Sequence, residues 1–184
     1  MGVALQKGAV RFIAITACGI VGVALSLLVT LEKIAVLGDP HHVPACSLSK
    51  LVNCLSVLDS PEASLFFGIP NSLIGLIGFS VVTSFGVFGI AFGTFPQWLW
   101  TCFTVGMLSA TLFCIFLSYV SSFLMGAVCL YCVGVWVVSS LGFALGLSPT
   151  LHNTRFAILC GYGPLAFGSC IIYFASVLIF GVFL

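Results

Sequence analysis

Residues 12–31 read FIAITACGIVGVALSLLVTL, and no charged side chain interrupts them. An apolar run of this length matches the ~20 residues that an α-helix needs to cross a bilayer. The whole chain shares this character: 61% of its 184 residues are hydrophobic and 5% are charged, with a mean hydropathy of +1.33. Soluble domains carry roughly 25% charged residues. Lipid is therefore the solvent that fits this composition, and five basic residues are too few to bind nucleic acid.

Polar and turn-forming residues divide the chain into five apolar runs. A polar stretch, 37–70, follows the first run, and Pro96 and Pro149 mark later breaks because proline cannot continue a hydrogen-bonded helix. We predict an all-α integral membrane protein in which residues 1–184 form a single membrane domain. The predicted transmembrane spans cover about 12–31, 71–92, 99–120, 128–147 and 156–184.

The few charged residues predict the orientation. Lys7, Arg11 and Arg155 fall on one side of a five-span bundle, with no acidic residue beside them. On the other side, acidic residues outnumber lysines in the 37–70 loop and at the end of the helix before it. The positive-inside rule then places the basic side in the cytoplasm. We expect a multi-pass protein of the cell membrane whose loop and 121–127 turn face outward.

Nine cysteines fall into two groups. Five lie within the apolar spans, where cysteine behaves as a small, unreactive hydrophobe: Cys18, Cys102, Cys114, Cys160 and Cys170. The other four lie at the outward face, as two pairs: Cys46 and Cys54 in the loop, Cys129 and Cys132 at the start of the fourth span. This face is the oxidising one, on which disulfides form and persist.

The segment Cys-Leu-Tyr-Cys, 129–132, has the Cys-x-x-Cys spacing at a predicted helix start. Unpaired N–H groups and the helix dipole stabilise a thiolate on the first cysteine, and the second lies one turn on, on the same face. Zinc sites use the same spacing, so a four-cysteine zinc site and a structural disulfide staple both stay open. Two pairs at one membrane face favour a thiol–disulfide electron relay. A transporter is disfavoured, because it should carry ionisable residues within its spans; here Glu32 and Lys33 lie near one helix end, and the remaining spans carry none.

The sequence also resembles the vitamin K epoxide reductase family, in particular its bacterial branch that links disulfide formation to quinones. The resemblance rests on CSLSKLVNCLSVLDSPEASLFFGIPNSLIG, 46–75, and on the CLYC motif. The matching features are the Cys-x7-Cys spacing, Ser60 six residues after the second loop cysteine, FGIPN ending at Asn71, and CxxC opening the fourth helix. The order of helices agrees as well.

This resemblance implies a four-helix bundle around a quinone, with a fifth transmembrane helix and an outward loop that carries a short helix. It implies that Cys129 and Cys132 are the active-site pair, with Cys132 nearer the quinone, menaquinone or ubiquinone. It also implies that Cys46 and Cys54 carry electrons from a partner's thiols. Ser60 and Asn71 match positions that shape the quinone pocket, although Ser60 also suits a helix cap and Asn71 an N-cap.

The sequence departs from the family in two places. No thioredoxin-like domain follows the fifth span, as it does in many bacterial relatives, so we expect a separate extracytoplasmic thioredoxin-like (DsbA-like) partner. Trp136 stands where the animal enzymes carry a tyrosine near the ligand ring, and we include it among the quinone-binding residues because an indole also stacks on a quinone. Vitamin K epoxide reduction of the animal type, and a non-catalytic subunit stapled by disulfide or zinc, are the alternative functions.

Overall fold

The structure is a computed structural model that describes residues 2–39, 42–44, 46–47, 53–58, 60–64, 68–152 and 163–183. Its α-helices are α1 (Gly2–Gly38), α2 (Cys54–Leu58), α3 (Asn71–Phe92), α4 (Gln97–Tyr119), α5 (Leu130–His152) and α6 (Gly163–Phe183). A 3-10 turn (Pro61–Ser64) follows α2, and a π-helical turn (Val120–Leu124) extends α4. The predicted all-α membrane bundle is confirmed, because four segments are long and apolar enough to span a membrane: Ala9–Gly38, Asn71–Phe92, Gln97–Leu124 and Leu130–Leu147.

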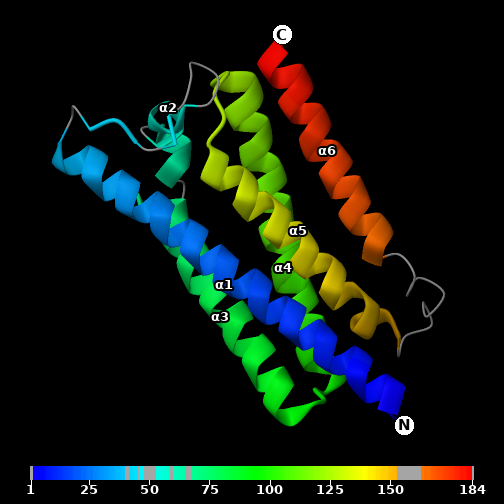
Figure 1. The fold of residues 1–184 in the computed structure, drawn as a ribbon. Coiled ribbons are helices and arrows are strands. Elements are labelled where there is room, and N and C mark those ends of the chain that lie inside the picture. The colour runs from blue at the N-terminus through cyan, green and yellow to red at the C-terminus, as the bar shows by residue number, and fades with distance from the viewer. Residues whose placement is uncertain are drawn as a thin grey trace.

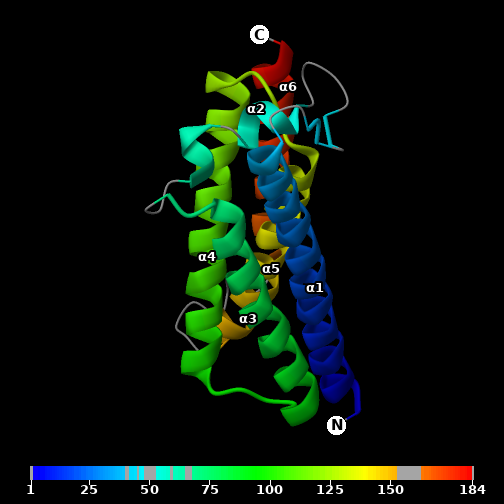
Figure 2. The same cartoon turned by 90° about the vertical axis from the view of Figure 1, so that its left-hand side faces the viewer.

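The helices lie roughly along one direction, with α1 beside α3 and α5 between α4 and α1 (Figures 1 and 2). The N-terminus and the turn at 93–96 lie at one end of the bundle, and α2 and the C-terminus lie at the other. α6 packs against α5 and contains a shorter apolar segment, Pro164–Ile179. A fifth membrane span therefore stays a prediction.

α5 continues past the end of its predicted span and includes Pro149. A proline in a helix leaves the carbonyl one turn earlier without its N–H partner. The last turn is held instead by α4, because the Gln97 amide donates to the carbonyl of Thr150 (2.6 Å) and, at 3.4 Å, to that of Pro149. The Thr150 hydroxyl lies 3.1 Å from the Trp100 carbonyl and 2.7 Å from the Thr104 hydroxyl. These side chains let the helix reach His152.

Aromatic rings fill the end of the bundle near the N-terminus. Phe12 of α1 stacks on Trp100 of α4 with ring centroids 5.4 Å apart, and Phe85 of α3 stacks on Phe103 at 4.4 Å. Phe95 meets Phe12 edge to face at 5.4 Å. Such pairs add about 0.5–1.5 kcal/mol each beyond the area they bury. These rings form a hydrophobic core at this end, and the paired cysteines lie at the other end.

Candidate active site

The loop pair forms a disulfide between Cys46 and Cys54, with Cα atoms 5.7 Å apart. Asn53 positions Cys54, because its side-chain oxygen accepts hydrogen bonds from the backbone N–H of Leu55 (3.0 Å) and of Ser56 (3.5 Å). An asparagine in this position caps a helix, so α2 starts at Cys54. Sequence reasoning missed Asn53, although an asparagine directly before a short apolar run is a helix-start signal.

The second pair lies where α5 begins. Cys129 directly precedes the helix, and its carbonyl accepts the N–H of Val133 at 3.1 Å. The sulfur of Cys129 lies 3.3 Å from that of Cys54, and both side chains are fully buried. Segments 75 residues apart are therefore in contact through their sulfur atoms, as thiol–disulfide exchange requires.

The environment of Cys129 favours its thiolate. The pKa of this thiol is lowered, first because the Cys132 thiol donates a hydrogen bond to it. Burial opposes the shift, and hydrogen bonds from the backbone at Cys132 and Tyr131 add to the lowering. Unpaired N–H groups at a helix start have this effect on a nearby thiolate. Cys129 is therefore suited to attack, or to leave from, the sulfur of Cys54.

The sulfur atoms of Cys46, Cys54 and Cys129 lie within 4.8 Å of one another, which is also close enough to hold a metal ion. Zinc binds thiolates, however, and two of these three sulfurs are bonded to each other. With the loop pair oxidised and Cys129 and Cys132 free, the cluster is a disulfide facing a dithiol. In this oxidation state its chemistry is exchange of the disulfide bond.

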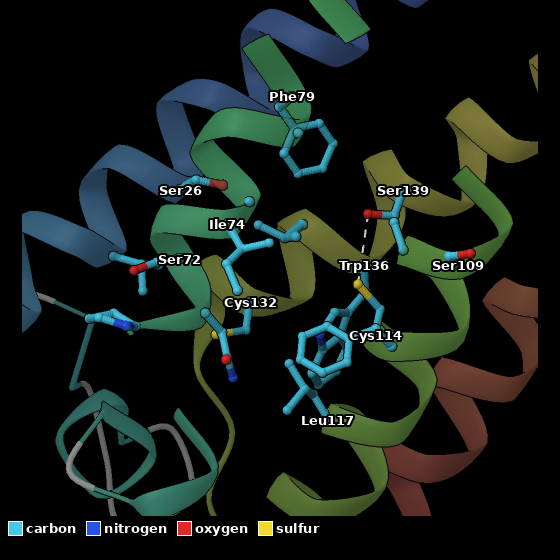
Figure 3. A pocket seen from close by; sticks show the side chains of 18 of the residues that line it. Ser26, Ser72, Ile74, Phe79, Ser109, Cys114, Leu117, Cys132, Trp136 and Ser139 are labelled. Atoms are coloured by element: carbon cyan, nitrogen blue, oxygen red, sulfur yellow. Dashed lines mark hydrogen bonds between the residues drawn. The ribbon is translucent and has the colours of Figure 1, made fainter. Parts of the chain in front are cut away.

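A cavity of about 820 Å³ lies beside the second pair (Figure 3). Its walls come from α1, α3, α4 and α5 and are mostly apolar, and its size is in the range of small-molecule sites. Cys132 lines it, and so do Ser60, Asn71 and Trp136. The structure thus brings one cysteine of the Cys-x-x-Cys pair and the three predicted quinone-binding residues to one cavity.

Ser60 and Asn71 reach the cavity from two helix boundaries. The Ser60 hydroxyl donates to the Val57 carbonyl at 2.9 Å, so this side chain both closes α2 and lines the cavity. Asn71 is the first residue of α3, and Pro70 stands at the N-cap position without a side-chain cap. The alternative role of Ser60 as a helix cap is thus compatible with the cavity, whereas Asn71 is not the N-cap.

Trp136 is almost fully buried, at 2% exposure, between the cavity and α6. Its ring stacks on Phe174 of α6, with centroids 5.3 Å apart and an interplanar angle of 20°. One face of the indole is thereby held by α6. The exchange cluster consists of Cys46, Cys54, Cys129 and Cys132. The helix α6 contributes no cysteine to it but supports the wall of the cavity through this contact.

Three cavity residues were not predicted from the sequence to be site residues. Lys33 lies at the end of α1, and its ammonium group donates to the Leu58 carbonyl at the end of α2. Cys114, predicted to be inert, donates a hydrogen bond to Ser139 at 3.7 Å, and both line the cavity. The spacing of Ser139, seven residues after Cys132, was the available signal, since this places both on one helix face. Arg155 and Cys160 lie outside the described residues.

Comparison with known families agrees with this geometry. The sequence matches the model of the vitamin K epoxide reductase family over residues 13–147, more than half of the chain. The matched range contains both cysteine pairs and the four long apolar helices apart from residues 9–12. No curated protein matches the chain. A buried disulfide contacts a Cys-x-x-Cys dithiol beside an apolar cavity in a helical membrane bundle, and this geometry agrees with the family match. The chain belongs to the vitamin K epoxide reductase family of membrane oxidoreductases, which use quinones.

Proposed function

We propose that this protein oxidises the thiols of a thioredoxin-like partner outside the cytoplasm and passes the electrons to a quinone, so that disulfide bonds form in that compartment. The observation that carries the proposal is the 3.3 Å contact between the sulfurs of Cys54 and Cys129. It joins the loop pair to the pair beside the cavity, so that electrons entering at one are delivered to the other.

The first step takes electrons from the partner. A partner thiolate attacks Cys46, the Cys46–Cys54 bond breaks, and Cys54 leaves as a thiolate. The partner's second thiol then displaces Cys46, so the partner departs oxidised and the loop pair becomes a dithiol. Two electrons and two protons have entered the loop pair. Cys46 is the entry sulfur because Cys54 faces Cys129.

The second step is internal. The Cys54 thiolate attacks Cys129 of a Cys129–Cys132 disulfide, and Cys132 leaves as a thiolate. Cys46 then attacks Cys54, which restores the loop disulfide and releases Cys129. The lowered pKa of Cys129 makes this thiol a good leaving group. The products are a loop disulfide and a Cys129–Cys132 dithiol, the oxidation state that the structure has.

The cavity suits the quinone in volume and in the chemistry of its walls. Cys132 supplies a sulfur, Trp136 a flat ring, and Asn71 and Ser60 polar groups for the oxygens of the ligand. When bound, a quinone supplies the acceptor for two electrons and two protons. As the Cys129–Cys132 dithiol gives these up, it returns to its disulfide and is ready for the next exchange.

The relay is tested by trapping its mixed disulfides. A partner whose second cysteine is replaced by alanine should stay bonded to Cys46 of the wild-type protein, because the thiol that would displace Cys46 is missing. Cys132→Ala should instead accumulate an internal Cys54–Cys129 bond. Mass spectrometry of the trapped species identifies both, and Cys18→Ala is the control. A partner bonded directly to Cys129 with the loop pair intact would reduce the loop disulfide to a staple. Binding of zinc by the reduced protein would support the alternative function, a non-catalytic subunit stapled by zinc.

We also propose that the sulfur end of the bundle lies outside the cytoplasm, which the charges at Lys7 and Arg11 at the opposite end support. A membrane-impermeant maleimide added to reduced, intact cells should label Cys46 or Cys54. Cys102 is exposed in α4 near the opposite end, so the experiment is done in a Cys102→Ser background. Labelling that requires an opened membrane would invert the orientation.

A further inference from the structure

Ser139 lies deep in the cavity and is 1% exposed. It follows Cys132 by seven residues on α5, so the two lie on one face of the helix and about 10 Å apart along its axis. Trp136 lies between them in sequence and lines the same cavity. Figure 3 shows Ser139 opposite Cys114, which belongs to α4. A ligand whose reactive end meets Cys132 therefore extends toward Ser139.

The hydrogen bonding of Ser139 differs from that of the neighbouring serine. The Ser140 hydroxyl, equally buried, donates to the Trp136 carbonyl one turn earlier, at 2.9 Å, as hydroxyls in membrane helices commonly do. The Ser139 oxygen instead accepts the Cys114 thiol, at 3.7 Å. Among the described residues, this contact with the Cys114 sulfur is the one side-chain hydrogen bond that Ser139 makes. Sulfur is a weak hydrogen-bond partner, so a ligand oxygen in the cavity would be a stronger acceptor for the Ser139 hydroxyl.

We infer that Ser139 donates a hydrogen bond to the quinone carbonyl farther from Cys132, with Cys114 orienting its hydroxyl; this rests on the proposed function. The lengths agree. The two oxygens of a para-quinone are roughly 5 Å apart, given C=O bonds of about 1.2 Å, and a hydrogen bond adds about 3 Å. Their sum, roughly 8 Å, is comparable with the axial separation of Cys132 and Ser139. Ser139 thereby favours ligands that carry a hydrogen-bond acceptor at their inner end.

The test compares Ser139→Ala with Ser140→Ala in the full-length protein. Menadione carrying ¹³C in its carbonyl groups is the probe, and the carbonyl stretching bands of the bound form are recorded by infrared difference spectroscopy. A donated hydrogen bond lowers the frequency of one carbonyl. Ser139→Ala should return that band toward the unbonded frequency and raise the Kd for menadione about three- to tenfold, the worth of one neutral hydrogen bond.

Ser140→Ala should leave both the band and the Kd unchanged, because that hydroxyl is bonded to its own helix. Ser139→Thr keeps a hydroxyl and should retain the lowered band. If Ser139→Ala binds and reduces menadione with the wild-type band and Kd, the assignment of Ser139 is overturned while the proposed function stands. If the wild-type protein neither binds nor reduces menadione, the proposed function fails, and the role of Ser139 fails with it.

Discussion

The contact of α1 with α3 and the space between α3 and α4 use glycine in opposite ways. In the first, glycines bring the helices together: a Cβ built on Gly86 would lie 2.3 Å from the Thr16 hydroxyl and 2.7 Å from its backbone nitrogen. In the second, Gly78 and Gly106 line the cavity, and no heavy atom lies within 4 Å of where a Cβ would be placed.

Membrane helices associate through close packing, since lipid offers no hydrophobic drive between them. The α1–α3 contact follows this rule, and it frees the remaining face of α3 from packing closely on α4. The small residues there leave the cavity between the two helices open. The difference teaches that a glycine-rich membrane helix has to be interpreted face by face, with one face for packing and another for a cavity.

The largest expected effect comes from removing a sulfur that lines the cavity. Cys132→Ala should abolish quinone reduction, because the sulfur that lines the cavity is lost and the Cys129 disulfide cannot re-form. Cys18→Ala should keep its activity, since Cys18 is buried in α1, away from the exchange cluster. Quinol formation is measured with reduced partner and menadione. Turnover in the Cys132 variant would remove this residue from the reaction.

Much of the fold and part of the candidate site were predictable from the sequence. The apolar runs predicted the helical bundle, and two cysteine pairs with loop and CxxC spacing predicted a thiol–disulfide site. The contact between Cys54 and Cys129 was not derivable from spacing alone, because it depends on how α2 folds over the start of α5. The extension of α5 through Pro149 also escaped prediction, since Gln97, 52 residues away in sequence, supplies the missing contacts.

The next effect concerns the close contact between α1 and α3. Gly86→Val should destabilise the bundle by about 1–3 kcal/mol, because the added carbons displace the backbone of α1 at Thr16. The fall in thermal midpoint of the detergent-solubilised protein measures it. Gly168→Val is the matched control in α6, where a Cβ meets nothing within 4 Å. Equal stability of the two variants would show that α1 and α3 do not depend on this close approach.

A smaller effect is expected in the cavity between α3 and α4. Gly106→Leu fills part of the cavity without a backbone clash, so the thermal midpoint should not fall, while the KM for menadione should rise roughly tenfold, about 1.4 kcal/mol of lost binding. Gly168→Leu should change neither quantity. An unchanged KM in the Gly106 variant would place the quinone elsewhere in the bundle.

The smallest effect tests the support that α6 gives to the cavity. Phe174→Leu keeps an apolar side chain of similar size but loses the ring that stacks on Trp136 at 5.3 Å. An aromatic pair of this kind contributes about 0.5–1.5 kcal/mol, so we expect the KM for menadione to rise about threefold with kcat nearly unchanged. The loss acts on the position of the indole wall and leaves the cysteines untouched.

Phe88→Leu is the matched control for this last change. Phe88 also stacks on a ring, that of Phe92 at 6.1 Å, but it is exposed on α3 and does not line the cavity. Its KM should equal that of the wild type. Phe174→Tyr, which keeps the ring, should restore the wild-type KM as well. If Phe174→Leu lowers kcat instead, then α6 acts on the exchange cluster itself, and the separation between a packed frame and an open cavity does not extend to this helix.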